Sequence, residues 1–115
     1  METVNLNLEI PLKYSAEICV VGAGPAGIAA AVTAARRGRK VILLDAHTMA
    51  GGMSTAAMVP CFMPFTDGVN FLAGGFGKEI IRGLNPEGGA RIRTEELKRL
   101  YEKLLTEAGV EVLYY

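Results

Sequence analysis

The sequence predicts an α/β fold in which a three-stranded parallel sheet forms in the order strand, helix, strand, helix, strand. Three observations favour this fold. Two short runs, 18–21 and 41–44, are continuously apolar and largely β-branched, as expected of parallel strands buried on both faces. An alanine-rich stretch over 25–37 lies between them and predicts a helix. A second helical segment, 94–108, then leads into a last strand over 110–115.

The first segment, 1–16, carries apolar residues that alternate with polar ones: Val4, Leu6, Leu8 and Ile10. The alternation stops at Pro11 and predicts either a short half-buried strand or an extended arm. Both alternatives place the start of the α/β domain at residue 17, so the domain is expected to cover 17–115.

The first predicted helix has clear ends. Pro25 stands near its first helical position, where a missing N–H is tolerated, and Gly38 is placed to end it. Four basic residues gather at the carboxyl end: Arg36, Arg37, Arg39 and Lys40. Cations there suit the negative end of the helix dipole, and this explanation is favoured over a phosphate or nucleic-acid role. The strand that follows is expected to end at Asp45.

Residues 46–77 show neither helical nor alternating periodicity, yet they carry many large apolar side chains: Met49, Met53, Met58, Val59, Phe62, Met63, Phe65, Phe71 and Phe76. A loop with this many apolar residues is poorly solvated, and we expect it to pack against another part of the protein or a cofactor. Residues 78–84 predict a short helix and 85–89 an exposed turn. Thr94 is expected to cap the last helix and Gly109 to end it.

Composition excludes several classes of function. Twelve basic residues balance twelve acidic ones, which removes the main electrostatic reason to expect a nucleic-acid or anionic-membrane partner. Half the residues are hydrophobic and the mean hydropathy is +0.28, which excludes disorder. Cys19 and Cys61 form no CxxC pair, so no metal site or disulfide framework is expected. Without a signal peptide or an apolar span, the expected location is the cytoplasm.

A glycine motif follows the first strand. Gly22, Ala23, Gly24, Pro25, Ala26 and Gly27 match the pattern G-x-G-x-x-G. In a chain with 14 glycines the bare pattern is weak, but here it begins where a buried strand stops and runs into a helix. Asp45 ends the next strand 18 residues after Gly27, close to the usual spacing of about 20. Together these features predict one half of a Rossmann-like dinucleotide-binding fold.

Each residue of this motif has a physical reason. Gly22 permits a tight turn, Gly24 lets the backbone approach a diphosphate, and Gly27 lets the helix lie close to the strand. The free N–H groups at the helix start then bind the diphosphate. Asp45 is expected to accept hydrogen bonds from the ribose hydroxyls and to repel a 2′-phosphate, which disfavours NADP.

The fingerprint does not separate NAD from FAD, because both present an ADP half. Beyond it, the sequence resembles FAD-dependent oxidoreductases of the glutathione-reductase-like superfamily, through residues 18–31, 41–45 and the pair Gly51-Gly52. Residues 51–59, 62–65 and 78–81 resemble the family known simply as FAD-dependent oxidoreductase. The resemblance implies non-covalent FAD.

The resemblance also implies which residues hold the cofactor. They are Gly22, Ala23, Gly24, Pro25, Ala26, Gly27, Asp45 and Ala46 for the ADP half, with Gly51, Gly52, Met53 and Ser54 near the diphosphate and ribityl part. Asp45 stands where the family more often has Glu, and the shorter carboxylate is expected to lengthen the hydrogen bonds to the ribose.

Two residues near this site leave alternatives open. No CxxxxC pair follows the glycine pair, so disulfide reduction by a dithiol is not expected, and Cys61 is interpreted as a small buried hydrophobe rather than a reactive thiol. His47-Thr48 is similar to the segment through which some flavoproteins attach FAD covalently, but its spacing to the glycine pair is one residue short. A loop histidine beside the ribose is the favoured interpretation.

The function predicted from the sequence is the FAD-binding part of a flavin-dependent oxidoreductase that acts on a small organic substrate. The alternatives are a stand-alone dinucleotide-binding module without turnover and the NAD-binding half of a dehydrogenase. No catalytic residue is identified here, and such residues are expected beyond Tyr115. The open sheet edge predicts an incomplete domain, inactive alone, that associates with the rest of the polypeptide or with itself.

Overall fold

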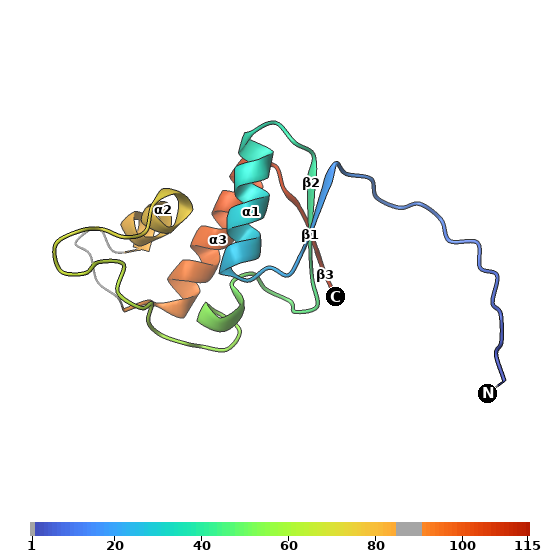
Figure 1. Ribbon diagram of the computed structural model, residues 1–115, viewed down its shortest axis with the longest axis horizontal. Helices are drawn as coiled ribbons and strands as arrows, with labels where there is room; N and C mark the ends of the chain where they lie inside the picture. The colour runs from blue at the N-terminus through green and yellow to red at the C-terminus, as the bar shows by residue number, and fades with distance from the viewer. Residues whose placement is uncertain (1, 85–90) are drawn as a thin grey trace.

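The structure is a computed structural model that describes residues 2–84 and 91–115 (Figure 1). Its elements follow in the order β1 (Ile18–Val21), α1 (Pro25–Arg36), β2 (Val41–Asp45), the 3₁₀ turn η1 (Gly52–Ser54), α2 (Gly75–Leu84), α3 (Thr94–Ala108) and β3 (Glu111–Tyr114). The turn expected over 85–89 lies outside the described residues.

The three strands form one parallel sheet in the order β1-β2-β3, with β2 in the centre. Ile18 pairs with Val41 at one end of the sheet, and Leu43 pairs with both Val20 and Val112 further along it. Helix α1 connects β1 to β2, and α2 and α3 lie between β2 and β3 in the chain. The predicted α/β fold with a parallel βαβαβ unit is confirmed.

The helices lie on one face of the sheet. Figure 1 shows the sheet edge-on, with the helices on one side and the N-terminal arm leaving on the other. Val41 and Leu43 point into this layer and are 1% and 0% exposed. The helices contribute the rest of the core, chiefly Ile28, Ala31, Val32, Leu97, Tyr101, Leu104 and Leu105.

The opposite face of the sheet differs from the sequence prediction. β1 was expected to be buried on both faces, but its residues alternate between half-buried and exposed, and Val21 is 80% exposed. Cys19, in the middle of the strand, is exposed as well. The physical reason is that every described helix packs on the other side, so no described helix covers this face. Ile42, on the same face but in the central strand, is nevertheless only 6% exposed.

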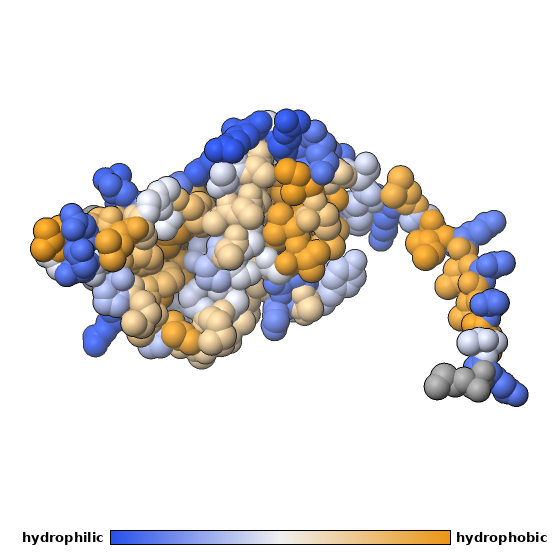
Figure 2. Space-filling view, in the orientation of Figure 1, coloured by the Kyte–Doolittle hydropathy of each residue, from blue (hydrophilic) through white to orange (hydrophobic). Residues whose placement is uncertain are grey.

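Residues 2–16 form an extended arm. Of the two alternatives that the alternating pattern left open, the half-buried strand does not form, because no described element pairs with this segment. Its apolar side chains, Val4, Leu6, Leu8, Ile10 and Leu12, are 74–88% exposed. Figure 2 shows them as apolar patches along the arm. Among the described helices, none is both long and apolar enough to cross a membrane.

Two of the four basic residues at the carboxyl end of α1 form ion pairs with acidic residues. Arg36 makes two hydrogen bonds, of 2.7 and 2.8 Å, to the carboxylate of Glu79 on α2. Arg39 lies 3.1 Å from a carboxylate oxygen of Glu17. Arg36 lies in the last turn of α1, the place where the sequence predicts that its charge suits the helix dipole.

Helix α3 begins at Thr94, one residue earlier than predicted. Thr94 is its first helical residue, and Arg93 occupies the cap position that was expected for Thr94. Glu95 and Glu96 lie in the first turn, where negative charge suits the helix dipole. Gly109 ends the helix, as predicted. Helix α2 begins at Gly75, three residues before the expected start.

The long loop after β2 is only partly packed. Phe62 and Phe65 meet edge to face at 5.5 Å between ring centroids, and Phe71 stacks on Phe65 at 6.0 Å. Phe62 and Phe76 also reach the core. The methionines behave differently, because Met53, Met58 and Met63 are 67–83% exposed. Cys61 is exposed too, so the prediction that it is buried as a small hydrophobe is wrong.

Candidate functional site

The turn between β1 and α1 brings backbone atoms into close contact. Gly22 has φ +101°, a conformation that residues with a side chain rarely adopt. A Cβ on Gly27 would lie 1.8 Å from the carbonyl oxygen of Gly22. That oxygen belongs to the backbone, so α1 can start this close to the strand only with glycine at 27. The tight turn and the close helix–strand packing predicted for these two residues are both present.

The start of α1 is suited to an anion. Gly24 is the N-cap residue in an extended conformation, and Pro25 is the first helical residue. In an α-helix the N–H groups of the first turn have no intrahelical partner, which leaves those of Ala26 and Gly27 to point out of the helix end. The first turn carries no acidic residue. The positive end of the helix dipole is therefore not offset locally.

A second glycine turn lies against the first. Gly51 has φ +114°, and its N–H donates a 2.7 Å hydrogen bond to the carbonyl of Ala23. A Cβ on Gly52 would come within 3.2 Å of the Gly24 Cα. Gly24 and Gly52, 28 residues apart in sequence, thus meet backbone to backbone at the carboxyl end of the sheet.

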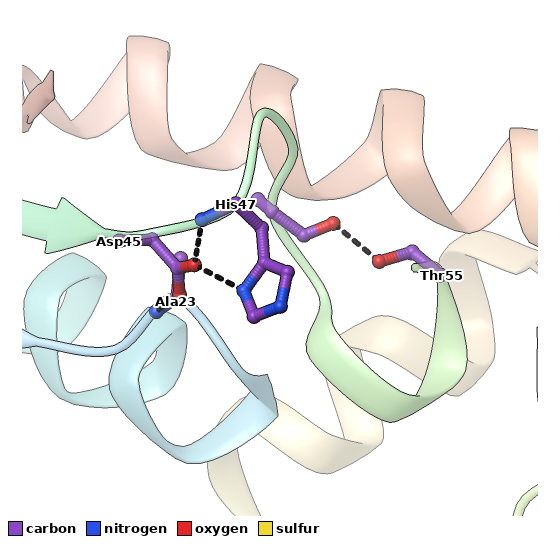
Figure 3. A network of polar contacts seen from close by, with 5 residues as sticks. Ala23, Asp45, His47 and Thr55 are labelled. Atoms are coloured by element: carbon purple, nitrogen blue, oxygen red, sulfur yellow. Dashed lines mark hydrogen bonds and ion pairs between the residues drawn. The ribbon is translucent and has the colours of Figure 1, made fainter. Parts of the chain in front are cut away.

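Buried hydroxyl groups fix this second turn. The Thr55 Oγ1 donates a 2.6 Å hydrogen bond to the carbonyl of Ala50, and the Ser54 Oγ donates one of 2.9 Å to the carbonyl of Gly51. Both residues are at most 5% exposed. Figure 3 shows the Thr55 bond on the far side of the loop from Asp45. Thr55 was not predicted from the sequence, since nothing local marks a threonine that holds a turn five residues back.

Asp45 ends β2 beside the first glycine turn (Figure 3). Its Oδ2 accepts a hydrogen bond from the backbone N–H of Ala23, and its Oδ1 accepts one of 2.7 Å from the N–H of His47. The Nδ1 of the His47 ring lies 2.8 Å from the same Oδ1. The Asp45 side chain is only 11% exposed. Its contact with His47 was not predicted, although a histidine two residues after an acid is a usable signal.

These contacts favour an ionised carboxylate at Asp45. The backbone N–H of Ala23, and next the N–H of His47, hold the pKa of Asp45 below its usual value. An ionised carboxylate only accepts hydrogen bonds, so the Nδ1 of His47 carries a proton in this contact. The end of β2 therefore presents a fixed negative charge.

An open pocket of about 390 Å³ adjoins these segments, lined by His47, Gly52, Met53, Ala56 and Ala57. Its size falls in the range of small-molecule sites. The structure thus brings together the predicted residues 22–27, 45–46 and 51–54. Two of them differ in what they can offer. Ala23 is fully buried, with its N–H bonded to Asp45 and its carbonyl to Gly51, and the Ser54 hydroxyl is turned inward.

A family model for FAD-dependent oxidoreductases matches residues 17–115 of this chain. The chain belongs to the FAD-dependent oxidoreductase family. Among curated relatives, it is 33% identical over 100 residues to the NADP(+)-dependent formate dehydrogenase subunit beta of Moorella thermoacetica, covering 82% of this chain and 13% of that protein. It is 32% identical over 94 residues to the flavin-dependent halogenase armH3 of Armillaria mellea, covering 80% and 18%.

Among solved structures, THI4 of Thermovibrio ammonificans superimposes with a TM-score of 0.60 at 20% sequence identity, over 86% of this chain and 38% of that one. At this identity the likeness shows the fold alone. The chain spans less than a fifth of the two curated relatives. The shared part is the Rossmann-like α/β unit, and the cofactor of the family is FAD.

The residues of this family member fit a dinucleotide. The diphosphate of FAD requires N–H donors and a backbone without Cβ atoms at the point of approach. Gly24 provides such a point, since a Cβ built there would meet no described atom within 4 Å. Asp45 supplies a fixed carboxylate next to it. Among the described residues, no group of three or more His, Cys, Asp or Glu side chains is arranged to hold a metal ion.

Proposed function

We propose that this chain binds FAD non-covalently and serves as the cofactor-binding part of an oxidoreductase acting on a small organic substrate. One observation carries the proposal. The Gly52 turn contacts Gly24 next to the Asp45 carboxylate, so two glycine segments and one acid converge at the carboxyl end of a parallel sheet. Ligands of open α/β sheets bind at this end. Bound FAD would supply hydride and electron transfer.

Each segment then has a role toward the ADP half. The N–H groups of the first turn of α1, from Ala26 and Gly27, would bind the diphosphate, and Gly24 and Gly52 would keep the backbone accessible. Asp45 and Ala46 would lie at the ribose. Met53 and Ser54 would face the diphosphate and ribityl part, Ser54 through its backbone because its hydroxyl is committed to the Gly51 carbonyl.

Catalysis would depend on protein beyond these residues. The chain would supply binding and orientation, and the groups that contact the substrate would come from further polypeptide or from a partner subunit. The bare face of the sheet, the side on which no described helix packs, supports such an association. Covering an exposed apolar residue such as Val21 removes its surface from water, which is favourable. The cytoplasm is the proposed location.

Isothermal titration calorimetry of the chain with FAD tests the binding. The informative variant is Gly24→Ala, whose Cβ meets nothing in the protein but would stand at the diphosphate. Overpacking of this kind costs about 1–3 kcal/mol, so affinity should fall about 5- to 150-fold while stability stays within about 0.5 kcal/mol. Gly74→Ala is the matched control, because a Cβ there also meets no described atom within 4 Å and Gly74 lies away from the site.

The same experiment separates the alternatives. Binding of NADH without binding of FAD would replace the proposal with an NAD-binding half of a dehydrogenase. Acid precipitation of FAD-loaded protein should leave the yellow colour in the supernatant. Colour retained in the pellet would contradict non-covalent binding and direct attention to His47.

A further inference from the structure

We propose that the His47 side chain competes with the ribose of the cofactor's ADP half for Asp45, and that it must leave the carboxylate before both ribose hydroxyls can bind. The inference rests on the proposed function and concerns a residue of the same site. Its basis is the pair of contacts that His47 makes with one oxygen of Asp45, at 2.7 Å from its N–H and 2.8 Å from its Nδ1.

Counting acceptor positions leads to the competition. A carboxylate has two oxygens and about four lone-pair positions. In Asp45, the Ala23 N–H takes one position on Oδ2, and the N–H and Nδ1 of His47 take both positions on Oδ1. One position on Oδ2 is left, and a ribose diol needs two. If the ring leaves and the backbone bonds stay, one position opens on each oxygen, which matches two neighbouring hydroxyl groups.

The ring is placed to leave. The His47 side chain is 69% exposed, whereas the Asp45 side chain is 11% exposed. Because water can replace the contact of a mostly exposed ring, the ring contact is the easiest to lose of the three that Asp45 accepts. The backbone bonds from Ala23 and His47 are part of the turn geometry and stay in place. Figure 3 shows the ring beside the Asp45 carboxylate, bonded to the same oxygen as the His47 N–H.

The role is therefore one of positioning and selectivity. While the ring is bound, Asp45 accepts a single hydroxyl, and part of the binding free energy of a diol is used to displace the ring. The competition weakens the binding of ligands that carry the diol and leaves the binding of ligands without it unchanged. His47 thus lowers the selectivity of the site for ribose over a dideoxy sugar.

The test compares ADP with 2′,3′-dideoxy-ADP by calorimetry on the full chain and its variants. His47→Ala removes Nδ1 and keeps the backbone N–H, so ADP should bind about two- to fivefold more tightly with no change for dideoxy-ADP. His47→Asn restores a side-chain N–H donor near Oδ1 and should return ADP affinity toward the original value. Thr48→Ala, at the exposed neighbouring position, is the control and should change neither ligand.

A second readout follows the ring itself. The ¹⁵N chemical shift of Nδ1 in labelled His47 should lose its hydrogen-bonded character during an ADP titration and keep it with dideoxy-ADP. Weaker ADP binding by His47→Ala would show that the ring is a ligand contact and would overturn the proposal, as would an unchanged ratio of the two affinities. Failure of the unmodified chain to bind either ADP or FAD would instead reject the proposed function, and this inference with it.

Discussion

The two faces of the sheet are built from similar residues but have different surroundings. On the helical side, Val41 and Leu43 are 1% and 0% exposed, and on the other side Val21 is 80% exposed. All three are apolar strand residues of the same sheet. The difference teaches that the sheet is stabilised from one side by α1 and α3, while on its second side β1 exposes apolar surface that no described helix covers.

The largest expected effect comes from a substitution on the covered face, the side of the sheet on which the helices pack. Leu43→Ala would leave a cavity at a fully buried position and should lower the free energy of unfolding by about 2–5 kcal/mol. Val21→Ala on the bare face removes methyl groups that are already exposed and should change it by about 0.5 kcal/mol or less. Urea unfolding followed by circular dichroism measures both. Equal losses would show that the second face is covered in solution.

A smaller effect is expected at the turn that fixes α1 to the covered face. Gly27→Ala would place a Cβ 1.8 Å from the Gly22 carbonyl oxygen, so the helix start must shift away from the strand. The expected loss is about 1–3 kcal/mol, with weaker ADP binding because the first-turn N–H groups move. The same urea series measures stability, with Gly74→Ala as the control. An unchanged stability would mean that the turn rearranges freely.

The covered face is the part of the fold that the sequence predicts best, because its signals are local. Apolar runs mark β1 and β2, helix formers mark α1, and Gly109 marks the end of α3. The exposure of Val21 and Cys19 could not be predicted, since a parallel strand has the same apolar pattern whether or not a second layer covers it. Burial depends on what lies across from a residue, and its own run of sequence does not contain that information.

The candidate site divides in the same way. The glycine motif and Asp45 follow from spacing, because the end of one strand and the start of one helix fix where they lie. The contact of Gly52 with Gly24 depends on how a long irregular loop returns to the sheet, which periodicity does not encode. The inward hydroxyl of Ser54 and the ring of His47 on Asp45 are side-chain orientations that only the folded loop determines.

A third prediction concerns Asp45, at the carboxyl end of the central strand β2. Its pKa is held below the usual value by the Ala23 N–H, so its contribution to stability is present above the unfolded pKa and is lost as the pH falls through the folded pKa. Hydrogen bonds to a charged group contribute about 1.5 kcal/mol or more. Asp45→Asn should therefore cost about this amount at pH 7.

The pH series supplies the control for this prediction. The difference in unfolding free energy between the original chain and Asp45→Asn should be constant from pH 7 to about pH 5. It should shrink as the pH falls below the usual pKa of an aspartate, about 3.9. A difference that grows on acidification would contradict the assigned direction of the pKa. His47→Ala removes the ring and keeps the backbone N–H. It therefore tests whether the ring helps the Ala23 N–H to lower the pKa of Asp45.

The smallest effect is expected at the rim of the covered face, where Arg36 on α1 meets Glu79 on α2. Two hydrogen bonds of 2.7 and 2.8 Å join the side chains, and the guanidinium of Arg36 holds the pKa of Glu79 below its usual value. Both side chains are more than a third exposed, so water and salt screen the pair. Arg36→Ala should cost about 1 kcal/mol or less, and less still in 1 M NaCl.

The salt series decides whether charge or packing holds α2 against α1. Lys103→Ala is a matched control, because Lys103 forms a looser ion pair, 3.8 Å from Glu107, within α3 alone. If Arg36→Ala costs more than its control at low salt and the two converge at high salt, the bidentate pair contributes through charge. A loss of several kcal/mol that salt does not change would mean that the stem of Arg36 packs between the helices. Helix α2 would then be held against α1 by the packing of the Arg36 stem as well as by the burial of Ile80 in the core.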